Sequence, residues 1–302
     1  MQKQGNFDMP QDFYIVDVFA EQPYSGNQLA VVVGDELPNS ETMQRIAAET
    51  NYSETTFISP GLNDNGNYAV RIFTPAREID FAGHPVLGTA WVLKHYVMKN
   101  TAIEVPLELS IGTVKVTFDV SETGDEVAWF RAPSMSLGKS ADLELMAMAL
   151  GLAPQDIDDT TPIQQVSAGT SAMIVPVRDF AALQRARLSL DAYAPLAAQD
   201  FPPLTYLFCS ETQDPDNDVC VRFFFEAHGV REDPATGNGA AFLGAYLLEH
   251  STGIGGQFSL RIEQGQAVQR PSRVLLKGKK EADADIIFVG GRVIPVIEGR
   301  LL

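Results

Sequence analysis

The sequence lacks any apolar run of the roughly 20 residues that a helix needs to cross a bilayer. Basic residues are also few, since 22 Lys and Arg stand against 39 Asp and Glu, which gives a formal net charge of −17. Such a field repels the phosphates of nucleic acids and of anionic lipids. We therefore expect neither a nucleic acid nor a membrane as a partner, and we expect the protein in the cytoplasm.

Cysteine is scarce as well. Cys209 and Cys220 are spaced for neither a zinc cluster nor a CxxC redox pair. Two cysteines in a chain of 302 residues are typical of reduced thiols in a cytoplasmic protein. The sequence contains no Gly-x-Ser-x-Gly elbow, and no His, Asp and Glu set has metal-ligand spacing. Serine hydrolysis and metal-dependent hydrolysis are therefore disfavoured.

What the chain does contain is an internal repeat. Five segments of the first half recur in the same order in the second half, and the pairs are residues 26–33 and 169–177, the following short helix and 180–188, 54–59 and 206–210, 69–74 and 219–225, and 86–89 and 242–245. The hydrophobic content of 45% is that of a globular protein, and the length allows two domains. We predict two β-rich repeats with one buried apolar helix each, over residues 13–150 and 160–302, and a flexible arm over residues 1–12.

The first candidate site is the start of the apolar helix in the first repeat, at Gly83-His84-Pro85. Glycine allows a ligand to approach the backbone, and free N–H groups at a helix N-terminus bind anions. A histidine at this place can hold a carboxylate or relay a proton. The structural alternative is that the glycine only permits tight packing and that His84 caps the helix.

The counterpart in the second repeat is Asp233-Pro234-Ala235-Thr236-Gly237-Asn238. The following proline keeps Asp233 extended, so its carboxylate can point into a cleft. An aspartate that merely caps the helix is the structural alternative. Two glycine-rich helix starts, one in each repeat, predict an anion site in a cleft between the domains.

A third candidate is Glu54, which follows Ser53 and leads into an apolar strand. Burial there would favour the protonated form of the carboxyl group, as a general acid/base at neutral pH requires. An exposed glutamate at a strand end is the alternative. We assign His95 and His250 to the C-terminal dipoles of the two central helices, and we leave a site role open for His228.

Together these segments resemble the PhzF-like isomerase family of phenazine biosynthesis, which has the diaminopimelate epimerase fold. The matching strings run in the family's order and are Asp17-Val18-Phe19, Gly26-Asn27-Gln28-Leu29-Ala30-Val31, Ser53-Glu54-Thr55-Thr56-Phe57, Arg71-Ile72-Phe73-Thr74-Pro75, Gly83-His84-Pro85, Asp233-Pro234-Ala235-Thr236-Gly237, Glu263-Gln264-Gly265 and Arg270-Pro271-Ser272. The resemblance implies an α+β fold of two pseudo-symmetric β-barrel-like domains, each enclosing a central helix. It also implies an active site between the domains, no metal or organic cofactor, and a homodimer.

The resemblance also implies roles for single residues. Glu54 matches the proton shuttle of the family, with His84 and Asp233 as polar partners at the substrate, and Gly83 and Gly237 match backbone that receives a substrate carboxylate. We place Ser53 and Asn238 among the substrate-binding residues. Asn238 stands where the family commonly has serine, and this departure puts the dihydro-hydroxyanthranilate substrate of the family in question.

The expected function is therefore a cofactor-independent isomerase that moves a proton on a small carboxylated metabolite, with Glu54 as the general acid/base. One alternative is an epimerase or racemase that uses Glu54 and Asp233 on opposite faces of the substrate. Another is a protein that binds a small carboxylate without turnover. A two-thiol racemase is disfavoured, because neither cysteine lies in these motifs.

Overall fold

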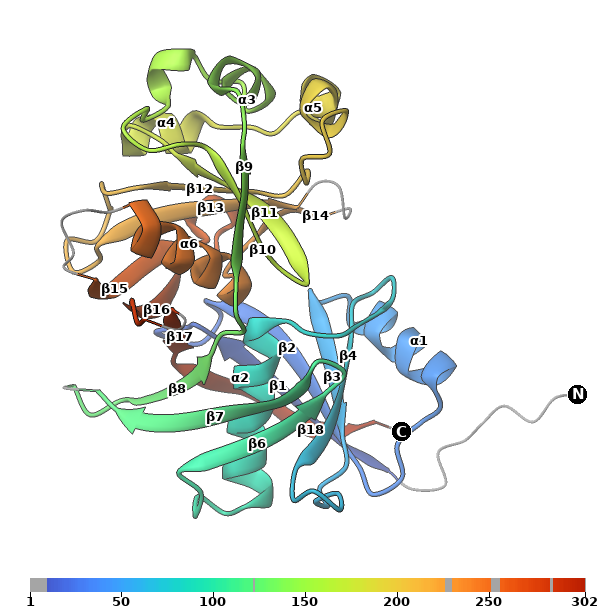
Figure 1. Ribbon diagram of the computed structural model, residues 1–302. Coiled ribbons are helices and arrows are strands. Elements are labelled where there is room, and N and C mark those ends of the chain that lie inside the picture. The colour runs from blue at the N-terminus through green and yellow to red at the C-terminus, as the bar shows by residue number, and fades with distance from the viewer. Residues whose placement is uncertain (1–9, 122, 226–229, 251–255, 283–284, 302) are drawn as a thin grey trace, which may run out of the picture. The chain divides into compact units, whose positions relative to one another are not determined.

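The computed structural model describes residues 10–121, 123–225, 230–250, 256–282 and 285–301 (Figure 1). The chain forms two compact units. The first unit combines Met1–Phe130 with the C-terminal segment Gly291–Leu302, and the second unit is Arg131–Gly290. These bounds differ from the predicted division at 150–160, because the end of each predicted repeat belongs to the other unit.

The first unit is a mixed sheet with a helix inside it. Its elements are β1 (Gln11–Val18), β2 (Asn27–Val33), α1 (Ser40–Thr50), β3 (Glu54–Ile58), β4 (Tyr68–Phe73), β5 (Glu78–Ile79), α2 (Gly83–Val92), the π-helical turn η1 (Leu93–Val97), β6 (Glu104–Leu109), β7 (Gly112–Val120), β8 (Glu126–Arg131) and β18 (Val293–Leu301). β1 is antiparallel to both β18 and β2, and β2 is parallel to β3. β3 is antiparallel to β4, β4 is parallel to β6, and β6, β7 and β8 follow as an antiparallel meander.

The second unit repeats these pairings one by one. Its elements are β9 (Ser136–Ser140), α3 (Leu143–Ala149), η2 (Pro154–Asp156), β10 (Gln164–Ala168), β11 (Thr170–Pro176), α4 (Phe180–Arg185), α5 (Leu190–Ala197), β12 (Thr205–Cys209), β13 (Val219–Phe225), β14 (Val230–Asp233), α6 (Gly237–His250), β15 (Gln257–Gln264), η4 (Gln266–Val268), β16 (Ser272–Lys279) and β17 (Ile286–Gly291). The sense of each pairing from β9–β10 to β16–β17 matches its counterpart in the first unit. The internal repeat expected from the sequence is therefore present.

The two repeats exchange their last strands. β9 ends the first repeat in the sequence but pairs with β10 of the second unit, whereas β18 ends the second repeat and pairs with β1 of the first. The register of β1 and β18 joins Gln11 to Leu301, and Gln11 is 1% exposed. The predicted arm over residues 1–12 is therefore wrong for residues 11 and 12, because both lie in β1 and pair with β18. Residues 1–9 lie outside the described part of the chain.

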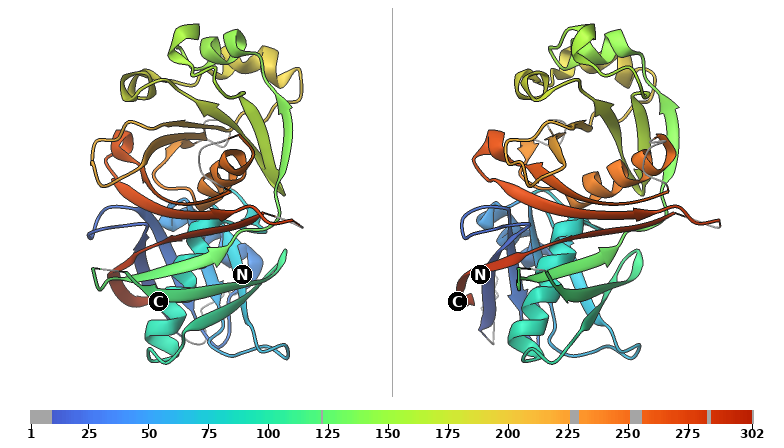
Figure 2. Two further views of the ribbon diagram at one scale, coloured as in Figure 1. Left: turned by 60° about the vertical axis from the view of Figure 1, so that its left-hand side comes forward. Right: turned by 90° about the vertical axis from the view of Figure 1, so that its left-hand side faces the viewer.

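Each unit encloses one helix, α2 in the first and α6 in the second (Figures 1 and 2). All 10 residues of α2 are buried, as expected for a helix with no polar face. A Cβ atom at Gly88 would lie 2.6 Å from the side chain of Leu29 and 2.9 Å from that of Val18, so this glycine lets α2 pack closely on β1 and β2. No helix in the described ranges has both the length and the apolar character needed to cross a membrane.

Candidate active site

In the first unit, Glu54 and His84 meet at the start of the central helix. Glu54 is the first residue of β3 and pairs with Leu29 in the parallel strand β2, while His84 is the second residue of α2. Oε2 of Glu54 lies 3.2 Å from Nε2 of His84, and the two side chains are 14% and 5% exposed. The sheet register and the helix start therefore bring the two residues together although they are 30 positions apart.

The imidazole of His84 is uncharged at neutral pH. Burial lowers the pKa of His84 to about 3, and a hydrogen bond with the Gln28 backbone only partly opposes this effect. The contact with Glu54 therefore joins a neutral imidazole to a carboxyl group and is not an ion pair. Nδ1 of the same ring lies 3.4 Å from the amide nitrogen Nδ2 of Asn27, a residue of β2 that is 0% exposed.

The backbone at the start of α2 adds a polar surface beside this pair. Gly83 and His84 are buried, and the N-cap residue Ala82 has no side chain that can accept a hydrogen bond. The first N–H groups of a helix have no intrahelical partner, and the helix dipole is positive at this end. The start of α2 is therefore able to receive an anionic group.

In the second unit, Asp233 ends β14 and is 8% exposed. Its Oδ2 accepts a hydrogen bond from the hydroxyl group of Thr236. α6 begins at Gly237, and the N–H of Ala240 donates to the Thr236 carbonyl at 3.0 Å. The loop of residues 233–236 thus connects a buried carboxyl group directly to the start of the second central helix.

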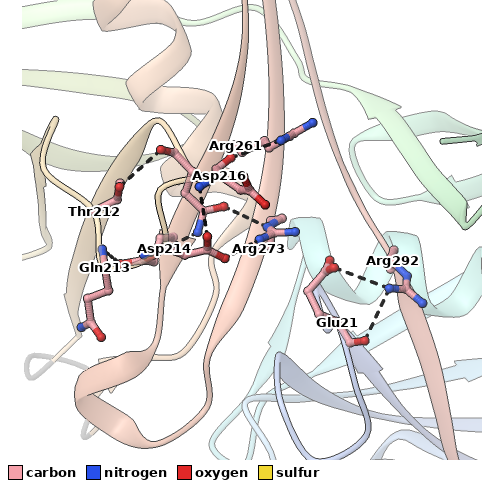
Figure 3. A network of polar contacts seen from close by, with 10 residues as sticks. Glu21, Thr212, Gln213, Asp214, Asp216, Arg261, Arg273 and Arg292 are labelled. Carbon is pink, nitrogen blue, oxygen red and sulfur yellow. Dashed lines mark hydrogen bonds and ion pairs between the residues drawn. The ribbon is translucent and has the colours of Figure 1, made fainter. Parts of the chain in front are cut away.

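The end of β15 holds this loop and a second loop next to it. Gln264 is 0% exposed and bonds to both ends of the 233–236 loop. The neighbouring Glu263 accepts from the backbone N–H groups of Gln213 and Asp214, at 3.0 Å each. Figure 3 shows the loop that contains Gln213 and Asp214 together with Arg273, whose guanidinium donates to Asp214 at 2.8 Å. The string Glu263-Gln264-Gly265 therefore acts as a structural anchor for two loops of the second unit.

The remaining predicted site residues lie next to these groups. Ser53 is half-buried and precedes β3, Gly83 begins α2, and Gly237 and the half-buried Asn238 begin α6. Within the first unit the structure thus joins Glu54 to His84, and within the second it joins Asp233 to the start of α6.

The other histidines have different surroundings. Nε2 of His95 lies 2.7 Å from Glu126, and its ring stacks on Trp91. Nε2 of His250 lies 2.6 Å from Oε1 of Gln164. These contacts give both residues side-chain partners besides the helix ends to which we assigned them. His228 lies outside the described residues.

Sequence reasoning gave no role to Asn27, Thr236 or Gln264. All three stand in strings that resemble the family. Asn27 and Gln264 contact residues that are 57 and 28 positions away, whereas Thr236 bonds to Asp233, three positions away in the same string. Their chemistry was therefore visible only as part of a matching string. Across the mapped ranges, no three His, Cys, Asp or Glu side chains gather as a candidate metal site.

The fold defines the general class of the protein. A hydroxyproline epimerase from Agrobacterium vitis superposes with a TM-score of 0.64 at 13% identity, with 98% of this chain and 94% of that chain covered. At this identity the likeness concerns the fold alone. The protein therefore has the α+β, diaminopimelate epimerase-like fold that was expected, and the expected fold class is confirmed.

The sequence comparison then identifies the family. Residues 16–299 match the family model "Phenazine biosynthesis-like protein", and the chain belongs to this family. A PhzF-family protein of Bacillus anthracis superposes with a TM-score of 0.88 at 26% identity, over 97% of this chain and 99% of that chain.

Two relatives carry the name of isomerase. An uncharacterized isomerase of Mesorhizobium japonicum is 34% identical over 300 residues, which cover 96% of this chain and 98% of the relative. The trans-2,3-dihydro-3-hydroxyanthranilate isomerase of Pseudomonas aeruginosa is 33% identical over 292 residues, which cover 95% of this chain and 98% of the relative. The chain is accordingly an isomerase of this family.

Proposed function

We propose that the protein is a cofactor-independent isomerase in which Glu54 takes a proton from one carbon of a small carboxylated substrate and returns it to another. The observation that supports this most directly is the 3.2 Å contact between Glu54 and the buried, neutral His84 at the start of α2. A general acid/base needs a carboxyl group that is partly desolvated and has a polar partner within hydrogen-bond distance.

A neutral imidazole suits this task better than a charged one. A full positive charge at 3.2 Å would stabilise the carboxylate and weaken it as a base. The uncharged ring of His84 can exchange hydrogen bonds with Glu54 in either protonation state without adding a net charge. A single carboxyl group that accepts and returns one proton favours migration of that proton between two carbons over inversion at one carbon.

The substrate carboxylate is, in this proposal, received by the N–H groups at the starts of α2 and α6, beginning at Gly83 and Gly237. Ser53 and Asn238 would bind its other polar groups. An asparagine amide reaches further than a serine hydroxyl. We therefore propose a substrate that differs from the one in the name of the Pseudomonas aeruginosa relative.

The test is proton exchange with solvent. The full-length protein is incubated in D2O with a panel of small cyclohexadienyl and aromatic carboxylates, and the substrates are followed by proton NMR. We expect at least one compound to isomerise with deuterium at the new C–H position, and we expect Glu54→Gln to abolish this. Glu49→Gln, on the exposed face of α1, is the matched control.

The other outcomes would replace the proposal. Deuterium at a single carbon with loss of optical rotation would indicate an epimerase that uses Glu54 and Asp233. Tight binding without turnover, unchanged in Glu54→Gln, would indicate a carboxylate-binding protein.

We also propose that the protein is a homodimer that works in the cytoplasm. The free, buried thiols of Cys209 and Cys220 support a reducing compartment. Light scattering after size-exclusion chromatography tests the dimer, and a mass of 32.9 kDa for the eluted particle would exclude it.

A further inference from the structure

The amide of Gln264 contacts both ends of the 233–236 loop. Its Oε1 accepts from the backbone N–H of Thr236 at 3.2 Å, and its Nε2 donates to the backbone carbonyl of Asp233 at 2.9 Å. A backbone N–H can only donate and a carbonyl can only accept. The two backbone groups therefore fix which way the amide faces, because a flipped amide would oppose donor to donor and acceptor to acceptor.

The fixed amide in turn directs a hydroxyl proton. Nε2 of Gln264 also donates to Oγ1 of Thr236 at 3.2 Å. A hydroxyl group has one proton and two lone pairs, so the Thr236 oxygen that accepts from Gln264 turns its proton elsewhere. That proton is donated to Oδ2 of Asp233. The order of donation therefore runs from Gln264 through Thr236 to Asp233.

The backbone next to Gln264 leaves it little freedom to move. Gly265 has a φ of +88°, and a Cβ atom there would lie 2.5 Å from the Pro234 carbonyl oxygen and 2.1 Å from that of Arg270. Only glycine allows this close approach of β15 to the 233–236 loop. On the other side, the carboxylate of Glu263 is held by the backbone of Gln213 and Asp214.

We propose that Gln264 is a positioning residue for Asp233, which it holds in one orientation as a hydrogen-bond acceptor through the hydroxyl group of Thr236. A carboxyl group that receives such a proton is stabilised in its ionised form. The catalytic consequence rests on the proposed function: Asp233 would present a fixed negative charge to the substrate. The order of donation itself does not depend on which substrate is bound.

Other ionisable groups on β14 and on strands β12 and β13 must be kept constant when Asp233 is titrated. Tyr206 of β12 and Asp233 interact electrostatically, and burial keeps the pKa of Tyr206 well above its usual value, so the phenol is uncharged at neutral pH. Glu232 precedes Asp233 on β14 and therefore points to the other face of the strand, where it pairs with Arg222. Cys220 of β13 stays a neutral thiol, because burial raises its pKa. The test therefore compares variants that leave all four of these groups unchanged.

The experiment is a titration of the Asp233 carboxyl carbon by NMR in the full-length protein labelled with 13C-aspartate, with Asp233→Asn to identify the signal. Thr236→Val removes the donated proton and should raise the titration midpoint by about one pH unit or more, from the usual strength of a hydrogen bond to a charged group. Thr236→Ser, which keeps the hydroxyl group, should leave the midpoint nearly unchanged.

The decisive comparison repeats Thr236→Val in proteins that already carry Gln264→Met. Because Gln264→Met removes the amide without adding charge, the hydroxyl group loses its fixed direction, and Thr236→Val should then raise the midpoint by clearly less. An equal rise in both backgrounds would overturn the proposal. If Gln264→Met does not fold, Gln264→Glu replaces it. Both proteins of that comparison, with and without Thr236→Val, carry the added carboxylate, so its charge does not affect the difference between their midpoints.

Two further measurements separate this proposal from the proposed function. Gln264→Met alone should raise the titration midpoint of Asp233, because the Thr236 hydroxyl group then donates to it less often, whereas Gln257→Met, at an exposed position of the same strand, should leave the midpoint unchanged. A shift in Gln257→Met as large as that in Gln264→Met would overturn the specific role of Gln264. Once a substrate is identified, the pH dependence of its kcat/KM gives a second readout. In Gln264→Met the pH at which kcat/KM falls on the acidic side should rise together with the NMR midpoint, and an unchanged pH would overturn the role of Gln264 in catalysis. The NMR comparison stands even when no compound of the panel is turned over.

Discussion

The two units have the same strand pairings but different polar residues at equivalent positions. Arg71 of β4 pairs with Phe57 of β3, and Arg222 of β13 pairs with Leu207 of β12. This register makes Leu204 the counterpart of Glu54. The proposed base is therefore present only in the first unit. At the register position of Asp233 the first unit has Ile79, and its own aspartate before the central helix, Asp80, stands one position later. The two units therefore share their strand pairings but carry different polar residues of the proposed site.

The same register exposes a second difference, in burial. The Arg71–Glu78 ion pair of the first unit has side chains that are 35% and 42% exposed, whereas Arg222 and Glu232 of the second unit are 8% and 3% exposed. The buried arginine also donates to the backbone carbonyls of Leu183 and Ala186. One ion pair therefore lies in solvent, and its counterpart ties α4 to the sheet.

The largest expected effect separates these two ion pairs. Glu232→Gln leaves the buried charge of Arg222 uncompensated and should lower the free energy of unfolding by about 3 kcal/mol. Glu78→Gln, at the exposed pair, should cost less than about 1 kcal/mol. Urea denaturation measures both, and similar losses in the two variants would refute the difference in burial.

The next effect separates the two carboxyl groups of the proposed site. Glu54→Gln should lower turnover by about 100-fold or more, the usual loss for a general base. Asp233→Asn should cost less, because we assign that residue to orientation and charge. Steady-state kinetics on a substrate from the panel decide the order, with thermal melting as the control for folding. A larger loss in Asp233→Asn would move the base to the second unit.

The pH dependence of stability should also differ between the units. His84 is neutral in the fold with a pKa of about 3, so the unfolded chain binds one more proton between about pH 6.5 and pH 3. Stability from this residue is present above pH 6.5 and is lost by up to about 1.4 kcal/mol per pH unit as the pH falls. His84→Gln should flatten this acid limb in urea denaturation measured from pH 7 to pH 4, and an unchanged slope would contradict the burial of the neutral ring.

In the second unit, the free energy of unfolding should instead depend on pH in the alkaline range. Burial raises the pKa of the Cys209 thiol to about 12, so the unfolded chain loses this proton first and stability falls as the pH rises above about 9. Cys209→Ala should remove part of that alkaline loss and leave the acid limb as it is.

The smallest expected effect concerns one hydroxyl group in each unit. Thr56 and Tyr206 occupy equivalent positions; Thr56 hydrogen-bonds to Thr89 at 2.8 Å, whereas no group in the described part of the chain bonds to the buried Tyr206 hydroxyl. Thr56→Val should cost about 1–2 kcal/mol, because it leaves Thr89 unpaired, and Tyr206→Phe should be neutral or slightly stabilising. Thermal melting of the two variants tests this, and a loss in Tyr206→Phe as large as in Thr56→Val would reveal a partner for the phenol.

Local elements were predictable from the sequence where pattern and capping agree. Strand β13 (Val219–Phe225) covers the repeated segment 219–225 that the sequence analysis found, and α1 begins after Asn39, whose side chain accepts from the Thr42 N–H. The apolar helix beginning at Gly83 was also found, although its end at Val92 passes into a π-helical turn. Alternating side chains and cap residues carry this information within a few positions.

Long-range partners were not predictable in the same way. The apolar run from Val293 to Ile297 favours a strand but does not say which strand it joins, so the pairing of β18 with β1 was not predicted. The site shows the same limit. Glu54, His84 and Asp233 stood out as polar groups beside apolar elements, whereas Asn27 and Gln264 gained meaning only from contacts across the fold.

The exchange of last strands has a consequence for the synthesis of the protein. β1 is translated long before its partner β18, because Gln11 pairs with Leu301, which is 290 positions (301 − 11) later in the chain. Throughout translation the first unit therefore presents an open sheet edge, which is a template for unwanted pairing with other chains. A chain that stops before residue 293 would contain strands β9 to β17 of the second unit but would lack β18 of the first, so the sheet of the first unit would keep an open edge at β1.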